Sequence, residues 1–189
     1  MKKKKLHPWS IKDSRYIFAD RWIKVRADDC VTKEGNIIAP YYVLEYPHWV
    51  HMVVLNEKNH VLVTQQYRHG ARRIAMELPA GTMDKSDRNP LAAAKRELME
   101  ETGYDGTFVL AGVSSPNPAT HTNSVYAYLI THPVQKETPK DNPSEVINYE
   151  FMPLKKLLAL IEKREFSQSM HISSLFLALR KGHIKIPAS

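Results

Sequence analysis

The sequence predicts an α+β protein, a class in which strands and helices occupy separate stretches of the chain. Three observations support this class. Most of the first 80 residues form segments rich in β-branched and aromatic residues, separated by turn sequences. The spacing of apolar residues then changes to that of a helix at residues 90–102. Two further amphipathic helical segments follow late in the sequence, without the regular alternation of strand and helix that typifies parallel sheets.

The expected strands come first along the chain. Residues 16–31 and 37–47 are rich in aromatic and β-branched residues, and the turn sequence KEGN lies between them. Residues 49–55 and 60–67 follow, separated by the polar sequence NEKN, and we expect them to form an antiparallel hairpin. Residues 73–79 are expected to form a further short strand.

The helix expected at residues 90–102 has recognisable ends. Asn89 is a suitable N-cap, Pro90 suits the first helical position, and Gly103 is the expected stop. The helix is about 13 residues, or about 20 Å, long. One apolar stripe at helical spacing is expected to face the core: Leu91, Ala94 and Leu98.

The remaining elements mix strands, a loop and helices. We expect strands at 107–114, 124–131 and 146–154, a proline-rich loop at 132–145, and helices at 154–164 and 170–181. Gly182 is expected to end the second of these helices.

Composition narrows the class of protein further. The 189 residues suit one ordinary domain, and 43% are hydrophobic, enough for a sizeable core. No apolar stretch approaches a membrane span, and the lysines at 2–5 lack the apolar region of a secretory signal. The single cysteine, Cys30, fits a reducing cytoplasm. The net charge is +7, and without those four lysines it is +3, which suits a phosphorylated small molecule as well as a nucleic acid.

Three glutamates crowd the end of the 90–102 helix. Glu97 shares a face with both Glu100 and Glu101, and no lysine or arginine follows any of them by four residues. The helix dipole also disfavours negative charge in the last turn. A divalent cation such as Mg²⁺ would relieve this repulsion, because Mg²⁺ binds carboxylates and substrate phosphates. A solvated face partnered by Lys95 and Arg96 is the alternative, and these residues alone leave both open.

A longer motif contains these glutamates. Gly81, followed after a loop by RELMEETGY at residues 96–104, resembles the Nudix box: glycine, then Arg-Glu-apolar-x-Glu-Glu-x-Gly-apolar at a fixed spacing. The segment QQYRHGARRIAMELPAG at residues 65–81 resembles the subgroup that hydrolyses ADP-ribose and other nucleoside diphosphate sugars. The resemblance extends from about residue 21 to about residue 179. It implies the Nudix fold, a mixed β-sheet sandwiched between helices, here with an N-terminal antiparallel β-extension.

The resemblance also implies the residues of a metal site. The glutamates matching Glu97 and Glu101 bind divalent metal in the family, the one matching Glu100 assists, and the carbonyl matching Ala80 is commonly a further ligand. The implied metal is Mg²⁺, with Mn²⁺ as an alternative. Such ions polarise phosphoryl oxygens and lower the pKa of a bound water, which gives a nucleophile at neutral pH.

Catalytic and substrate-binding roles follow from the same resemblance. Glu145 matches a glutamate in a late loop that acts as general base or metal ligand. A solvated loop carboxylate is its alternative, and Glu150 is its nearest rival, expected within a strand. Arg68 matches an arginine that contacts substrate phosphates, and the alternative is a salt bridge at the strand end to Glu77. Trp22 matches an aromatic that stacks on the base, and the alternative is an aromatic of the core or of an interface. The expected catalytic residues are Glu145, Glu100 and Arg96, and the expected substrate-binding residues are Trp22, Arg68, Glu77, Thr82 and Asn117.

The sequence departs from the family pattern at one position. The family has a glutamate eight residues before the box arginine, where this chain has Arg88, and one extra residue lies between Gly81 and the helix. A partly buried Arg96 needs an acidic partner in this loop. We expect Asp87 to be that partner, with Asp84 as the fallback and Arg88 directed to solvent or the substrate phosphates.

The resemblance implies a Mg²⁺-dependent pyrophosphatase that splits ADP-ribose or another nucleoside diphosphate sugar into a nucleoside monophosphate and a sugar phosphate. The expected divisions are a basic tail at 1–13, a β-extension at 14–47 that exchanges strands across a homodimer, and a hydrolase domain at 48–189. Two other functions stay open: a Nudix enzyme acting on the 5′ end of RNA, helped by the lysine tail, and a non-catalytic module that senses a nucleotide. No membrane and no nucleic acid partner is expected.

Overall fold

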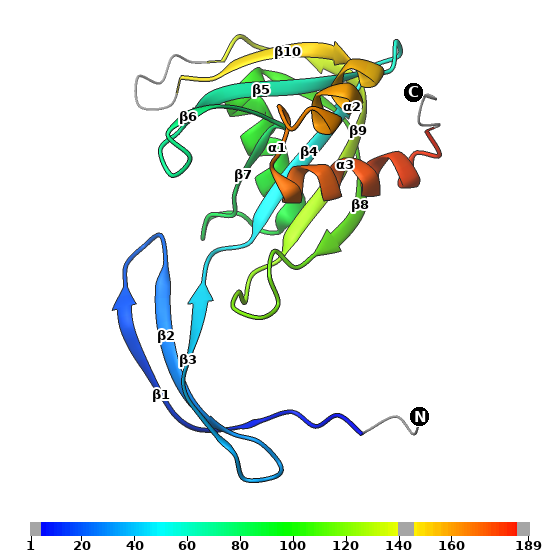
Figure 1. The fold of residues 1–189 in the computed structure, drawn as a ribbon. Coiled ribbons are helices and arrows are strands. Elements are labelled where there is room, and N and C mark those ends of the chain that lie inside the picture. Colours follow the sequence, from blue (N-terminus) through cyan, green and yellow to red (C-terminus); the bar gives the residue numbers. More distant parts are fainter. Residues whose placement is uncertain (1–4, 140–145, 185–189) are drawn as a thin grey trace. The chain divides into compact units, whose positions relative to one another are not determined.

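A computed structural model describes residues 5–139 and 146–184, which form two units (Figure 1). The first unit contains a three-stranded antiparallel sheet in the order β1-β2-β3, with β1 at Ser10–Ala19, β2 at Lys24–Val31 and β3 at Ile37–Glu45. Strand β1 begins at Ser10, so its first residues belong to the stretch that was expected to be a tail.

Residues 115–123 belong to the first unit, although they are distant from it in the sequence. The amide of Leu44 donates a hydrogen bond of 2.7 Å to the carbonyl of Thr120, and the amide of Thr122 donates one of 3.2 Å to the carbonyl of Leu44. The hydroxyl of Tyr41 also donates to the carbonyl of Ala119. These bonds hold the loop as an additional edge beside β3.

The second unit is built on a mixed sheet in the order β10-β5-β4-β9-β8. These strands are β4 at Trp49–Leu55, β5 at His60–Arg68, β8 at Tyr104–Ser114, β9 at Val125–Gln135 and β10 at Asn148–Pro153. Two shorter strands join it: β6 at Arg73–Glu77 pairs with β5, and β7 at Ala80–Thr82 pairs with β4. Among the described strands, β4 and β9 are the pair that runs parallel. Strand β9 continues to Gln135, through residues that were expected to be loop.

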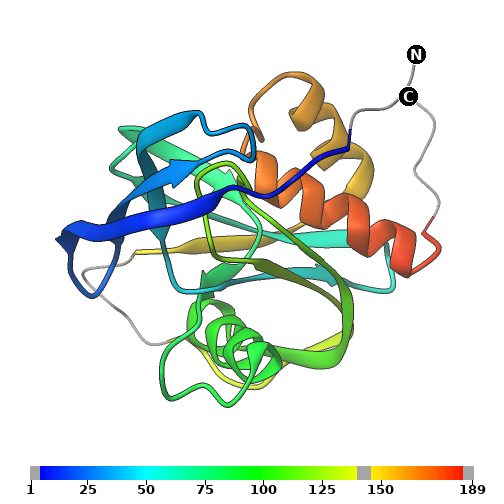
Figure 2. The same ribbon diagram turned by 90° about the horizontal axis from the view of Figure 1, so that it is seen from below.

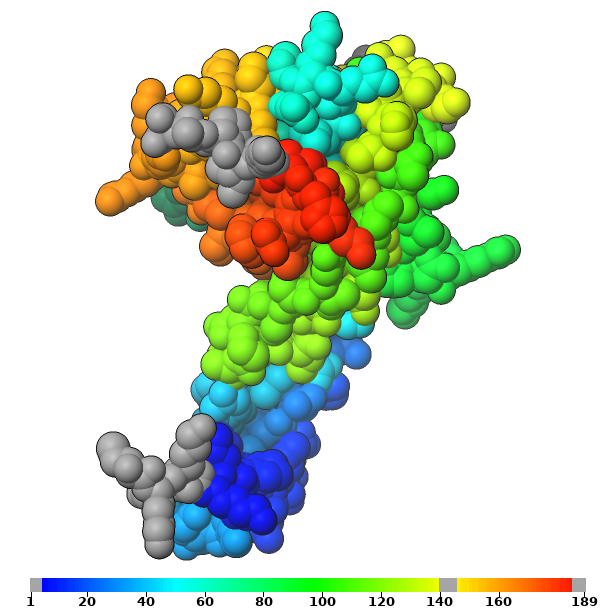
Figure 3. Space-filling view, turned by 90° about the vertical axis from the view of Figure 1, so that its right-hand side faces the viewer, coloured from blue at the N-terminus to red at the C-terminus, as the bar shows by residue number. Residues whose placement is uncertain are grey.

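Helices cover both faces of this sheet (Figure 2). Helix α1 at Pro90–Thr102 packs on one face, and helices α2 at Leu154–Glu162 and α3 at Ser169–Lys181 pack on the other. Alternate residues of β4 point to the two cores, because successive side chains of a strand face opposite sides. Helix α3 forms an outer face of the unit (Figure 3). The α+β class and the sandwich of helices around a mixed sheet are therefore confirmed.

The ends of α1 are those that the sequence predicts. The side chain of Asn89 accepts a hydrogen bond from the amide of Ala92, and Gly103 adopts φ 71° as the helix ends. The expected apolar stripe is wrong at one position, because Leu91 is 37% exposed. The buried apolar face consists of Ala93, Ala94 and Leu98, which are fully buried.

The hairpin expected from β4 and β5 forms only next to its turn. The described pairing of the two strands is limited to Leu55 with Val61. Beyond that pair, residues 73–82 supply the neighbours: β6 pairs with β5, and β7 pairs with β4. This separation brings residues 80–82 onto the edge of β4 and against α1.

Two histidines are buried on the α3 side of the sheet. His51 of β4 and His171 of α3 are 3% and 2% exposed, and their ring centroids lie 4.2 Å apart. Burial lowers the pKa of His171 to about 3 and the pKa of His51 well below its ordinary value of 6.5. Both rings are therefore neutral at pH 7.

No helix in the described part of the chain has the length and apolar character needed to cross a membrane.

The low pKa of His171 predicts a loss of stability in acid. Below pH 6.5 His171 is protonated in the unfolded chain, whereas in the folded protein it stays neutral down to about pH 3. The free energy of unfolding therefore falls across that range. Between pH 7.5 and 4.5 this histidine alone should account for about 2–3 kcal/mol. We therefore expect His171→Asn to lose less stability than the wild type over this interval, as measured by urea unfolding at both pH values.

The matched control is His132→Asn, which removes an exposed histidine and should keep the pH dependence of the wild type. Equal pH dependence for His171→Asn and the wild type would contradict the assignment.

Candidate active site

Helix α1 and strand β7 approach each other closely at Gly81. A Cβ atom at this position would lie 2.0 Å from Cδ of Glu97, so a residue with a side chain would displace the Glu97 carboxylate from its present place. The amide of Thr82 donates to Oε1 of Glu97, and the amide of Ala80 donates to Oε2 of Glu101, both at 3.2 Å. The amides of two alternate residues of β7 therefore donate hydrogen bonds to two of the three crowded carboxylates.

Arg96 joins the loop after β7 to the acidic end of α1. Its Nε and Nη2 bind Oδ1 and Oδ2 of Asp87 at 3.2 and 2.9 Å, and Nη2 also donates to the carbonyl of Thr82 at 3.1 Å. On its other side, Nη1 lies 3.0 Å from Glu97 Oε1 and 3.0 Å from Glu100 Oε2. One guanidinium thus connects the loop, the strand and two of the glutamates.

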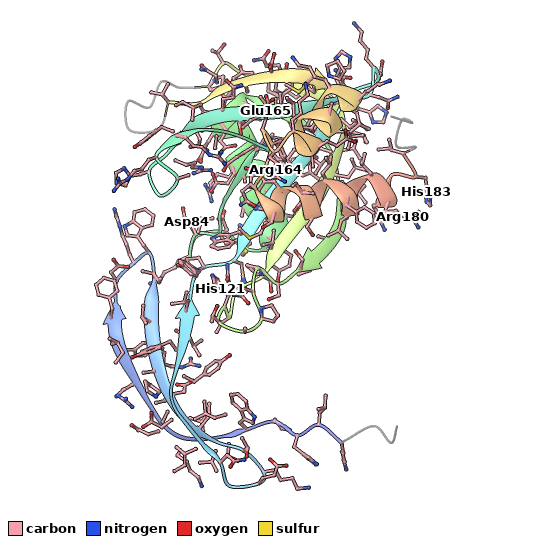
Figure 4. The ribbon with its side chains drawn as sticks, viewed as in Figure 1. Asp84, His121, Arg164, Glu165, Arg180 and His183 are labelled. Atoms are coloured by element: carbon pink, nitrogen blue, oxygen red, sulfur yellow. The ribbon has the colours of Figure 1, made fainter. Side chains whose placement is uncertain are left out.

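Asp87 is the acidic partner of Arg96, as predicted. Its side chain is 6% exposed, and its hydrogen bonds with Arg96 lower its pKa despite the burial, while they raise the pKa of Arg96. Asp84, labelled in Figure 4, lies 3.9 Å from Arg96 with a side chain 67% exposed, so it is a secondary partner. Its amide donates to Oδ2 of Asp87 at 2.8 Å. Arg88 is exposed.

The carboxylate of Glu97 is held in an environment that disfavours its charge. Burial raises its pKa to about 7, although Arg96 acts in the opposite direction and the nearby charge of Glu100 adds to the increase. A cation beside Glu97 would favour the ionised form. A bound cation would therefore hold Glu97 in its charged form.

The chemistry of the available donors fits a hard divalent cation. Glu97 and Glu101 supply carboxylate oxygens, and the strand between them supplies backbone carbonyls, which are the ligands that Mg²⁺ and similar ions prefer. Within residues 5–139 and 146–184, no three histidine, cysteine, aspartate or glutamate side chains are grouped as a complete metal site. Glu100 instead bonds to Arg96 and is 61% exposed. Two carboxylates suit an ion that keeps waters and takes further ligands from substrate phosphates.

Arg68 and Glu77 form the salt bridge that was the alternative expectation for Arg68. Nε and Nη2 of Arg68 bind Oε2 of Glu77 at 2.9 and 2.6 Å, and the Glu77 side chain is 7% exposed. Both residues line a cavity of about 140 Å³ with Arg73, Ser167 and Glu165, the last of which is labelled in Figure 4. The two hydrogen bonds from Arg68 to Glu77 hold the Arg68 guanidinium in one orientation at this cavity.

The other expected residues are spread over the chain. Trp22 and Asn117 belong to the first unit, where Trp22 is 64% exposed and the Asn117 side chain bonds to Thr120 and to the amide of Ala119. Glu145 lies outside the described residues. Glu150 lies within β10, as expected, and is exposed. The Thr82 carbonyl also accepts a hydrogen bond from Arg96, and this contact was not predictable, because every residue carries a backbone carbonyl.

Comparisons with known proteins place these features in a family. The family model for the NUDIX domain matches residues 46–171, and the model for the nucleoside diphosphate sugar hydrolase N-terminal domain matches residues 9–44. The chain is 25% identical to the methanol dehydrogenase activator of Bacillus methanolicus, covering 88% of this chain and 90% of the relative. It is 27% identical to the ADP-ribose pyrophosphatase of Bacillus subtilis (strain 168), covering 79% and 80%. A crystal structure of an ADP compounds hydrolase shares the fold, with a TM-score of 0.83 and 21% identity over 97% of this chain and 100% of the other.

The loop before α1 yields a test of the Arg96 environment. We expect Asp87→Asn to lower the free energy of unfolding by about 2–3 kcal/mol, because it removes the charge of the carboxylate that binds two nitrogens of the partly buried Arg96 guanidinium. Arg88→Ala should change it by less than about 0.5 kcal/mol, because Arg88 is exposed. Chemical denaturation of the two variants measures both values. A larger loss for Arg88→Ala than for Asp87→Asn would contradict this description of the loop.

Proposed function

The chain belongs to the Nudix family, and from this premise we propose that it hydrolyses the pyrophosphate bond of ADP-ribose or another nucleoside diphosphate sugar with Mg²⁺. The products are a nucleoside monophosphate and a sugar phosphate. The observation that carries the proposal is the pair of carboxylates, Glu97 and Glu101, received by the amides of Thr82 and Ala80. The match of residues 9–44 to the nucleoside diphosphate sugar hydrolase N-terminal domain supports the class of substrate.

In this proposal Glu97, Glu101 and the Ala80 carbonyl hold the metal, and Glu100 assists. The bound Mg²⁺, or Mn²⁺ in its place, supplies charge that polarises the phosphoryl oxygens and acidifies a water. Arg96 has a supporting role, because it fixes Glu97 and Glu100 against the loop through Asp87, so that the carboxylates do not separate under their mutual repulsion. Glu145 is proposed as the residue that accepts the proton of the attacking water.

Substrate recognition is proposed for residues of both units. Arg68 suits the phosphates, because Glu77 holds its guanidinium in one orientation and its side chain is 41% exposed. Thr82, whose amide donates to Glu97, is proposed to contact the substrate beside the carboxylates. Trp22 offers an exposed ring for stacking on a base, and Asn117 offers an amide for the sugar. A cytoplasmic location, consistent with the unpaired and buried Cys30, completes the proposal.

A substrate panel tests the function directly. ADP-ribose, GDP-mannose, a dinucleotide and a 5′-triphosphorylated RNA are incubated with the protein and Mg²⁺, and the products are separated by chromatography. Release of a nucleoside monophosphate from the nucleotide sugars supports the proposal. Cleavage of the RNA alone, or binding without turnover of any compound, would overturn it in favour of the other two functions considered above.

The metal assignment predicts the behaviour of two variants. We expect Glu97→Gln and Glu101→Gln each to lower kcat by about a thousandfold, because the loss of metal-borne charge stabilisation raises the barrier by several kcal/mol. Circular dichroism should show a retained fold, since glutamine keeps the shape of the side chain. Glu162→Gln at the exposed end of α2 is the matched control and should keep normal turnover. Near-normal kcat in both site variants would show that the ligands are elsewhere.

We also propose a homodimer joined through the N-terminal strands. Strand β1 lies at the edge of its sheet and exposes Ile11, Tyr16, Ile17 and Phe18, each by more than half of its surface. Exposed apolar edge strands favour pairing with another chain.

Light scattering at micromolar concentration should therefore give the mass of a dimer. The double substitution Ile17→Asp, Phe18→Asp should shift it to a monomer, because it places charges in the apolar contact. Lys12→Glu on the same strand is the control and should remain dimeric. A monomeric wild type with full activity would refute the dimer.

A further inference from the structure

Two buried histidines adjoin the strand that carries the proposed metal site, and the proposed function gives neither of them a role. His51 is the β4 residue paired with Ala80 of β7. His171 accepts a hydrogen bond of 2.9 Å at Nδ1 from the amide of Leu78, two residues before Ala80. The backbone of His51 thus lies opposite the first residue of β7, and the ring of His171 bonds the chain two residues earlier.

The hydrogen bond to Leu78 fixes the state of the His171 ring. A backbone amide can only donate, so Nδ1 must be unprotonated and the neutral ring carries its proton on Nε2. Nδ1 of His51 lies 2.9 Å from the hydroxyl of Ser174, one turn along α3 from His171. Helix α3 is therefore connected by polar contacts both to β4 and to the segment that leads into β7.

Segment 78–82 is held by a series of backbone hydrogen bonds. The Pro79 carbonyl accepts from the amide of Met52 at 2.9 Å, and the amides of Ala80 and Thr82 are committed to Glu101 and Glu97. Leu78 is the point at which this segment bonds to α3. It lies about 7 Å along an extended chain from Ala80. A shift at Leu78 would therefore move the amides of Ala80 and Thr82, which donate to Glu101 and Glu97.

We propose that His171 is a positioning residue of the metal site: by holding the Leu78 amide at Nδ1, it fixes the Ala80 carbonyl and the amides that receive Glu97 and Glu101. This inference rests on the proposed function for its metal. His171 lies on the α3 side of the sheet, and it acts through the backbone of residues 78–82 without contact with the substrate.

Three substitutions separate the acceptor from the bulk of the ring. Asparagine carries an oxygen on Cγ, where histidine carries Nδ1, so His171→Asn keeps the acceptor close to its place. His171→Gln moves the oxygen one bond further, and His171→Leu removes it. Leu179→Ala is the control for lost stability, because Leu179 is equally buried on α3 but lies about 12 Å further along the helix.

Binding of Mn²⁺ alone, titrated by electron paramagnetic resonance in the absence of substrate, is the first measurement. We expect the dissociation constant to rise at least fivefold in His171→Leu and His171→Gln, and to stay within twofold of the wild type in His171→Asn and Leu179→Ala. Unchanged binding in His171→Leu, equal loss in Asn and Gln, or equal loss in Leu179→Ala would overturn the proposal. If His171→Leu does not fold, the comparison of Asn with Gln decides.

Hydrogen–deuterium exchange of the metal-free protein separates this inference from the function itself. A wild type that binds no Mn²⁺ at millimolar concentration would refute the metal-dependent function. Exchange of the peptide containing residues 78–82 then still decides the role of His171. Faster exchange in the Leu and Gln variants, with wild-type exchange in the Asn variant, supports positioning, whereas equal exchange in all four proteins overturns it.

Discussion

The close approach of β7 to α1 at Gly81 is the constraint on which the candidate site depends. The absence of a Cβ lets the strand pass within bonding distance of the acidic turn of the helix, and two amides of β7 then receive Glu97 and Glu101. Without that approach, the last turn of α1 would place its carboxylates against the unfavourable end of the helix dipole and against one another. The strand replaces solvent as the partner of these charges, and it does so in a fixed geometry.

Arg96 keeps this arrangement together from the other side. Its guanidinium is shared between Asp87, which is almost buried, and the carboxylates of Glu97 and Glu100. An arginine suits this place because its planar fork can bond a carboxylate with two nitrogens while a third remains directed elsewhere. Asp87 stands one residue before the position at which the Nudix pattern has a glutamate, and its two carboxylate oxygens bond Arg96.

The elements that were predictable from the sequence are those determined by local contacts. The limits of α1 follow from Asn89, Pro90 and Gly103, because caps act within a few residues. The role of Asp87 was predictable because a partly buried arginine requires an acid within reach of a short loop. The separation of β4 from β5 was not predictable, since the hydrophobic pattern of a strand does not specify its neighbour. The exposure of Leu91 was not predictable either, because it depends on how α1 is rotated on the sheet. The attachment of residues 115–123 to β3 likewise rests on contacts about 75 residues apart in the chain.

The residues proposed to recognise the base and the sugar belong to a different unit from the residues of the carboxylate site. The loop bearing Asn117 is bonded to β3 through Leu44, and Trp22 lies in the same unit, so both residues proposed to recognise base and sugar share one unit. The carboxylates, Arg96 and the histidine behind β7 all belong to the other. On this proposal, substitutions of Trp22 or Asn117 would alter which nucleotide sugar is accepted and would leave the hydrogen bonds that hold Glu97 and Glu101 in place. Changes around Leu78 or Asp87 would instead disturb the position of the carboxylates. They would leave the residues proposed to contact the base and the sugar unchanged.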